Sequence, residues 1–180
     1  YFSEYKFYTE NHGGKIVPVR SKEGTFSLDI DAIKNAINEK TKAIIINSPN
    51  NPTGTVYTEE SLVLLSEVLN SVDHAIYVLS DEPYIKILYD NTELPSVLKI
   101  FNNSIVINSF SKSLALPGER IGYAIVNPKA ECADSLIQAM IFANRTLGYV
   151  NAPSLLQKVI ANHLDDVVGL DDYKAKRDAL

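Results

Sequence analysis

Three short runs of apolar residues recur at intervals of about thirty residues, and each one stops abruptly at polar side chains. The runs cover residues 43–46, 75–79 and 105–107. A short, continuous apolar run is typical of a strand that is buried on both faces, as in a parallel sheet. Ligand sites of such sheets lie beyond the carboxyl ends of the strands. The sequence therefore predicts a parallel sheet with one site at that edge.

The residues that follow the three runs differ in chemistry. The first run leads into an amide-rich turn that contains Asn51, the second into the carboxylate of Asp81, and the third into the amine of Lys112. Because the carboxyl ends of parallel strands meet at one edge of a sheet, we expect the amide, the acid and the amine to share one site.

Strands that alternate with helices favour an α/β fold with a three-layer, doubly wound and predominantly parallel sheet. Asp29 and Thr58 are of the residue types that cap helices, and the leucines at 62, 65 and 69 are spaced to face a core. Strands are expected at residues 15–20, 43–46, 75–79, 105–107 and 121–126. Helices are expected after Asp29 and Thr58, near 96–101, from Asn127-Pro128 toward Asn144, from 151–153 to about His163, and from Asp171 or Asp172.

Composition narrows the class of protein. The 180 residues are 46% hydrophobic, as expected for a globular domain. The net charge of −5, with no basic cluster, argues against a nucleic-acid partner or an anionic membrane surface, and no apolar stretch is long enough to cross a bilayer. The one cysteine, Cys132, cannot form an internal disulfide, so we expect a reducing, cytoplasmic location. The three histidines have no metal-ligand spacing, and no metal is expected.

Four motifs in order along the chain carry a resemblance to a known family. They are Asn51-Pro-Thr-Gly54, Asp81-x-x-Tyr84, Ser109-x-Ser-Lys112, and Arg120 eight residues after the lysine. Together they resemble the class I/II aminotransferases, fold-type I enzymes of the aspartate aminotransferase superfamily that depend on pyridoxal 5′-phosphate (PLP). The chain looks like the central segment of their large, PLP-binding domain.

The resemblance implies catalytic roles for Lys112, Asp81 and Tyr84. Lys112 would form a Schiff base with the cofactor aldehyde and then move protons. A lysine just past a buried strand is expected to be partly desolvated, which favours its uncharged form. Asp81 would face the pyridine nitrogen and keep it protonated. A carboxylate about 4 Å from that cation contributes ~4 kcal/mol at an effective dielectric of about 20, which is about three pKa units. Glu82 has no assigned role.

The family's other cofactor contacts are carried over to matching positions. Asn51 and Tyr84 would both hydrogen-bond the phenolic oxygen of the cofactor. Ser109, Ser111 and Arg120 resemble the phosphate anchors, since a guanidinium offers a planar fork that matches phosphate oxygens. An aromatic ring that stacks on the pyridine face in the family would be Tyr1, or Phe2 beside it.

The implied domain organisation is partial. Residues 1–168 would belong to the large domain, and residues 169–180 would begin the helix that leads to a small domain. Neither the family's phosphate-covering loop nor the arginine that grips the substrate carboxylate is found in this sequence. We therefore expect this chain alone to be catalytically inactive. The resemblance separately implies that the intact enzyme is a homodimer.

The implied reaction is transfer of an amino group between an amino acid and a 2-oxo acid. A β-lyase or an aminocyclopropane-carboxylate-type synthase would use the same residues, because each begins with the same Schiff base. A non-enzymatic sensor domain of a regulator, or a relic that no longer binds PLP, are further alternatives. The amino-acid substrate stays open.

Overall fold

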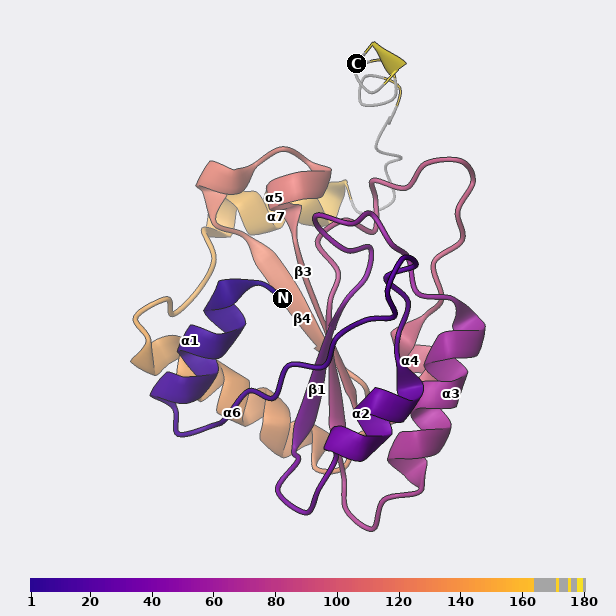
Figure 1. The fold of residues 1–180 in the computed structure, drawn as a ribbon. Coiled ribbons are helices and arrows are strands. Elements are labelled where there is room, and N and C mark those ends of the chain that lie inside the picture. The colour runs from indigo at the N-terminus through magenta and orange to yellow at the C-terminus, as the bar shows by residue number, and fades with distance from the viewer. Residues whose placement is uncertain (164–170, 172–174, 176–177, 180) are drawn as a thin grey trace.

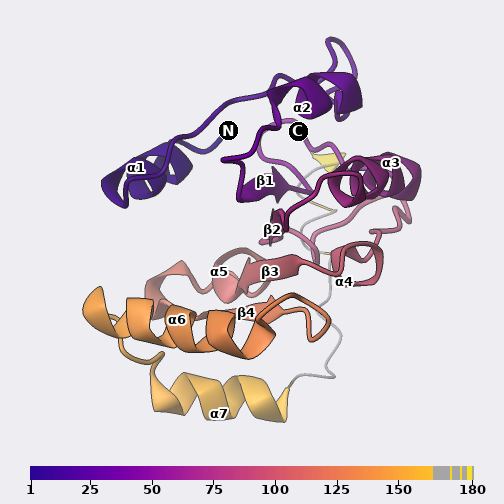
Figure 2. The same ribbon diagram turned by 90° about the horizontal axis from the view of Figure 1, so that it is seen from below.

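The computed structural model describes residues 1–163, 171, 175, 178 and 179. Its centre is a four-stranded sheet in the order β1-β2-β3-β4, with helices on both sides (Figures 1 and 2). The first two pairings are parallel and the last, β3 with β4, is antiparallel. The strands are β1 (Ala43–Asn47), β2 (Tyr77–Asp81), β3 (Ser104–Ser109) and β4 (Gly122–Val126). The predicted α/β architecture with a mostly parallel sheet is confirmed.

The helices connect the strands and flank the sheet. They are α1 (Ser3–Asn11), α2 (Ile30–Ala36), α3 (Glu59–Asn70), α4 (Val97–Ile100), α5 (Phe110–Ser113), the 3-10 turn η1 (Pro117–Glu119), α6 (Ala133–Thr146) and α7 (Ser154–Asn162). Two predicted caps are confirmed: the Asp29 side chain accepts from the Ala32 amide at 3.0 Å, and the Thr58 hydroxyl from the Ser61 amide at 3.2 Å. Both caps depend on residues three apart, which is why the local sequence predicts them.

Helix α3 covers one face of the sheet and supplies much of the core. Leu62, Leu65 and Leu69 are buried there, as predicted, against strand residues such as Val78 and Val106. Helix α1 lies on the other side of the sheet from α3 (Figures 1 and 2). On that side the apolar packing is incomplete, because the Ile107 side chain is 41% exposed.

One predicted strand is absent, and one predicted helix is present but starts later than expected. Residues 15–20 are not a strand in the structure: they are mostly exposed and join no sheet. The helix predicted from Asn127-Pro128 begins only at Ala133. The buried Asn127 amide instead donates to the carbonyls of Leu98 and Phe101 at 2.9 and 2.8 Å. This tether holds the chain in a turn before α6 begins.

The remaining expectations differ in whether the structure tests them. Helix α7 ends next to His163, as predicted. The domain boundary at 168/169 and the helix expected from Asp171 or Asp172 fall largely outside the described residues.

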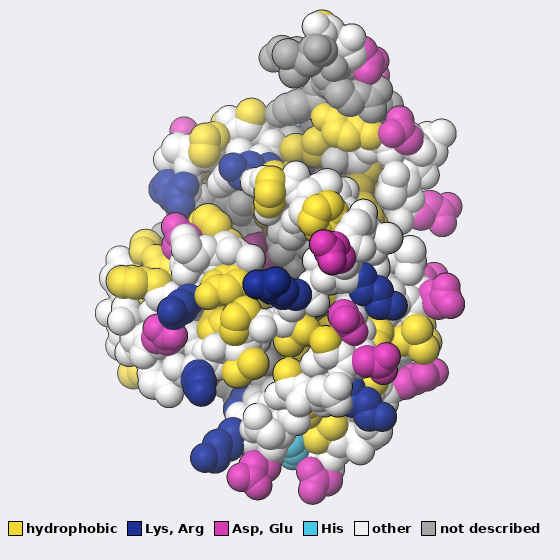
Figure 3. Space-filling view, viewed as in Figure 1, with side chains coloured by type: hydrophobic (Ala, Val, Ile, Leu, Met, Phe, Trp, Pro, Cys, Tyr) yellow, Lys and Arg dark blue, Asp and Glu magenta, His cyan; other side chains and the backbone are white. Residues whose placement is uncertain are grey.

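None of the described helices has the length and apolarity that a membrane span requires. Acidic and basic side chains are interspersed on the face shown in Figure 3.

Candidate active site

The carboxyl ends of β1 and β2 are joined by side-chain hydrogen bonds. Asn47, the last residue of β1, donates from Nδ2 to the carbonyl of Asp81 at 2.8 Å. Its Oδ1 accepts from the Asn50 side chain at 3.2 Å and from the backbone N–H of Asn51 at 3.4 Å. Asn47 therefore links the amide-rich turn after β1 directly to the end of β2, where residue Asp81 lies opposite it in the register.

Two of the predicted site residues meet above this link. The Asn51 side chain donates from Nδ2 to the Tyr84 hydroxyl at 2.7 Å, although the residues are 33 positions apart. Asn51 is exposed and Tyr84 is half-buried, so both polar groups are within reach of a ligand. The convergence of the first two strand ends, which the sequence predicts, is thus present in the structure.

Asp81 is half-buried at the end of β2, and its carboxylate is bound by a residue that the sequence did not single out. The hydroxyl of Tyr5, on α1, donates to Asp81 Oδ2. Burial raises the pKa of Asp81, while the hydrogen bond from Tyr5 favours the charged form and lowers it. Burial and the bond to Asp81 raise the pKa of Tyr5 well above its usual value, so its hydroxyl keeps the proton that it donates.

No local signal could have identified Tyr5. It is one of ten tyrosines and lies in an aromatic-rich segment. Its contact with Asp81 spans 76 positions. Only the placement of α1 beside the sheet brings the two side chains together.

Lys112 lies on α5, the short helix that begins directly after β3. Its position beyond the third strand end agrees with the prediction, but the expected burial is wrong, because the residue is exposed. The helix carries Lys112 beyond the sheet edge, where fewer neighbours cover it. No hydrogen bond or ion pair of its amine is present within the described part of the chain.

The predicted phosphate anchors share the connection between β3 and β4. Ser109 pairs with Gly122 in the antiparallel ladder, so Arg120 returns close to the end of β3. A Cβ atom at Gly122 would lie 2.5 Å from the carbonyl oxygen of Asn108, so only glycine permits this close approach. The Arg120 guanidinium donates to the carbonyl of Pro117 and forms no ion pair with the described residues. Ser109 and Ser111 are both half-buried.

Tyr1 and Phe2, the two candidates for the aromatic ring that stacks on the cofactor, have different surroundings in the structure. Tyr1 is strongly exposed and has no ring contact with the described residues. The ring of Phe2 packs edge-to-face on Tyr5, with 5.8 Å between the ring centroids. Through Tyr5, Phe2 is the candidate that is connected to Asp81.

Glu82 is a second residue whose position the sequence left unexplained. Alternation along a strand directs Ser80 and Glu82 to the face opposite Asp81. The Glu82 carboxyl is buried there and accepts a 2.7 Å hydrogen bond from the Ser80 hydroxyl. Burial raises the pKa of Glu82, the hydrogen bond from Ser80 offsets part of that rise, and the neighbouring charge of Asp81 adds to it.

This raised pKa predicts a pH-dependent cost of folding. The relevant pH range lies between the pKa of Glu82 in the unfolded chain and its higher pKa in the folded protein. In this range the folded state binds more protons at Glu82 than the unfolded state does, so the free energy of unfolding falls as pH rises. In Glu82→Gln, the contribution of Glu82 to this fall should be absent. Thermal unfolding of both proteins across the acidic to neutral range would test this. The difference in Tm, mutant minus wild type, should grow more positive as pH rises. A difference that is constant with pH would contradict the prediction.

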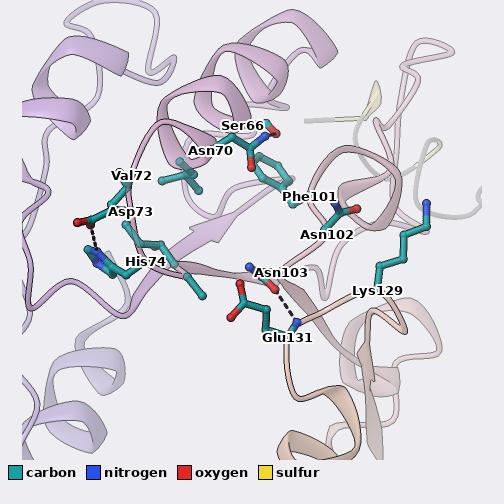
Figure 4. Close-up of a pocket in the computed structure, with 13 residues that line it drawn as sticks. Ser66, Asn70, Val72, Asp73, His74, Phe101, Asn102, Asn103, Lys129 and Glu131 are labelled. Atoms are coloured by element: carbon teal, nitrogen blue, oxygen red, sulfur yellow. Dashed lines mark hydrogen bonds and ion pairs between the residues drawn. The ribbon is translucent and has the colours of Figure 1, made fainter.

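A polar hollow lies at the opposite end of the sheet, where β2 and β3 begin (Figure 4). His74 on its wall contacts the Asp73 carboxylate at 3.1 Å and lowers the pKa of that group. On the far wall the Asn103 side chain accepts from the amide of Glu131 at 2.8 Å. None of the predicted site residues lines this hollow, so it is separate from the candidate active site.

Comparison with known proteins agrees with this geometry. The chain belongs to the family "Aminotransferase class I and II", whose sequence profile matches residues 1–180. Members of this family depend on PLP. The predicted family membership is confirmed.

Relatives and solved structures support the assignment. The aspartate aminotransferase of Bacillus subtilis is 43% identical over 129 residues, which are 69% of this chain and 32% of that protein. A probable aspartate aminotransferase of Methanocaldococcus jannaschii is 40% identical over 78% of this chain and 36% of its own length. An amino transferase structure from Eubacterium rectale superposes with a TM-score of 0.92 at 43% identity, over 99% of this chain and 46% of that one. The chain thus spans about a third of these curated relatives.

Proposed function

We propose that this chain forms the cofactor-binding part of an aminotransferase that moves an amino group between an amino acid and a 2-oxo acid. The observation that carries the proposal is the hydrogen-bonded network through Asn47 that holds Asn51 and Asp81 at one sheet edge, with Tyr84 bound to Asn51. Lys112 follows the next strand at the same edge. The names of the relatives favour transamination over lyase or synthase chemistry, and over a sensor or a relic.

The donor set fits PLP. A half-buried carboxylate whose charged form is supported by a hydrogen bond suits a protonated ring nitrogen, which is the role of Asp81. The Asn51 amide and the Tyr84 hydroxyl, already in contact, would donate to the phenolic oxygen. Ser109, Ser111 and Arg120 would hold the phosphate. When bound, the cofactor supplies an electron sink for bond cleavage at the substrate Cα.

Lys112 is proposed as the residue that attaches the cofactor and then carries a proton. Its exposed amine on α5 is accessible to an aldehyde. Once the substrate amine has displaced Lys112 from the cofactor, the freed lysine amine would move the proton between the substrate Cα and the C4′ carbon. We further propose that residues 1–168 belong to the large domain and that the intact enzyme is a cytoplasmic homodimer. Aspartate and aromatic amino acids are the first donors to test, since relatives bear those names.

Borohydride reduction tests the proposed attachment. The chain would be mixed with PLP, reduced, digested and analysed by mass spectrometry. We expect a pyridoxyl label on Lys112 that is lost in Lys112→Ala. Lys129→Ala is the matched control, because Lys129 lines the hollow at the other end of the sheet and should leave the label unchanged. Equal labelling of wild type and Lys112→Ala would refute the assignment.

A further inference from the structure

We propose that Tyr5 is a positioning residue for the cofactor: its phenol holds one oxygen of Asp81 and leaves the other oxygen free for the cofactor ring nitrogen. This inference rests on the proposed function of the site. It starts from the bond between Tyr5 on α1 and Asp81 Oδ2 at the end of β2. Among the described residues, no other group donates a hydrogen bond to this carboxylate.

The placement of α1 explains why Tyr5 can reach Asp81. Strand alternation directs Asp81 away from the α3 face, on which Ser80 is buried. Helix α1 lies on the side of the sheet opposite α3 (Figure 2). The edge-to-face contact with Phe2 supports the Tyr5 ring from the start of the helix. The phenol is therefore held on the face to which Asp81 points.

The Tyr5 bond has two effects on Asp81. A carboxylate that turns freely could offer either oxygen, and fixing Oδ2 removes that freedom from the residue that must meet the ring nitrogen. A donor to the carboxylate also favours its charged form, which burial opposes. Both effects act through Asp81, so Tyr5 itself need not touch the cofactor.

The bond between Tyr5 and Asp81 contributes little to the stability of the fold. None of the α1 residues is buried. Within the described part of the chain, the Tyr5 hydroxyl makes the one hydrogen bond that joins α1 to the sheet. Removing the hydroxyl should therefore change Asp81 while leaving the core of α3 and the strands intact. Function and folding can then be separated by experiment.

A double-mutant cycle on PLP affinity tests the inference. The dissociation constant would be measured for wild type, Tyr5→Phe, Asp81→Asn and the double variant. A hydrogen bond to a charged group corresponds to about 10- to 100-fold in binding, and we expect Tyr5→Phe to weaken PLP binding by about this factor. In the Asp81→Asn background the same change should have no effect. Tyr8→Phe is the control, because Tyr8 is an exposed tyrosine on the same helix.

A second measurement needs no cofactor. Carbon-13 NMR of the Asp81 carboxyl, assigned with Asp81→Asn, should show its titration midpoint at higher pH in Tyr5→Phe and unchanged in Tyr8→Phe. Incorporating 3-fluorotyrosine at position 5 keeps the ring and makes the hydroxyl a stronger donor, so the midpoint should move to lower pH. This variant also serves if Tyr5→Phe fails to fold.

The outcomes distinguish the two proposals. If wild type fails to bind PLP, the proposed function fails, and the carboxyl titration still decides whether Tyr5 acts on Asp81. If the Asp81 midpoint is the same in wild type, Tyr5→Phe and the fluorinated protein, the inference is overturned. The inference would also be overturned if Tyr5→Phe weakened PLP binding by the same factor in wild type and in the Asp81→Asn background.

Discussion

Asp81→Asn is expected to weaken PLP binding by about 10- to 1000-fold. An opposite charge in contact shifts the pKa of an ionisable group by about 1–3 units, and each unit is a factor of ten. The substitution keeps the shape of the side chain and removes the charge that would hold the ring nitrogen protonated. Nitrogen-15 NMR of labelled PLP would report the ring nitrogen directly, and a binding titration would report the affinity.

The neighbouring carboxyl supplies the control for this prediction. Glu82→Gln removes an acid one residue away, on the face that carries the Ser80 contact. It should leave the ring nitrogen protonated and the affinity near that of wild type. If Asp81→Asn and Glu82→Gln had equal effects on both measurements, a general electrostatic contribution would replace the specific role of Asp81.

Leu65→Ala is expected to lower the free energy of unfolding by about 2–5 kcal/mol. Leu65 lies on α3 with 0% of its surface exposed, in the cluster that joins the helix to the sheet. Truncation removes buried methyl groups and leaves a cavity that close packing fills only in part. Urea unfolding followed by far-ultraviolet circular dichroism would measure the loss.

Leu64 provides a comparison at the adjacent position. Its side chain is 44% exposed on the same helix, and Leu64→Ala alters helix propensity by the same amount. We expect this variant to lose less than about 1 kcal/mol, as is usual for surface positions. Similar losses at both positions would show that α3 does not pack on the sheet as described.

The parts of the fold that the sequence predicts are those with short-range causes. The apolar runs that form β1, β2 and β3 can be recognised in the sequence because strands buried on both faces have continuous apolar sequences. The Asp29 and Thr58 caps involve residues three apart. Residues 15–20 have the composition of a strand, but a strand also needs a partner, which no local pattern can supply.

The parts that were missed depend on contacts between distant segments. The turn after β4 is set by the buried Asn127 amide, which bonds to the end of α4. In the candidate site, the pattern of three buried strands that each end in polar residues predicts Asn51, Asp81 and Lys112 at one sheet edge. It could not show that Tyr5 from α1 would bind Asp81, or how exposed Lys112 would be, because both depend on the packing of whole elements.

The antiparallel return of β4 has a consequence for how the site could change over time. Lys112 and Arg120 lie on a single short link between adjacent, directly paired strands. Their spacing is therefore fixed by the few residues between them and by the close backbone contact at Gly122. Insertions elsewhere in the chain would leave the distance between the proposed covalent anchor and the proposed phosphate anchor unchanged. Under the proposed function, contacts with the substrate can therefore diverge while coenzyme binding is retained.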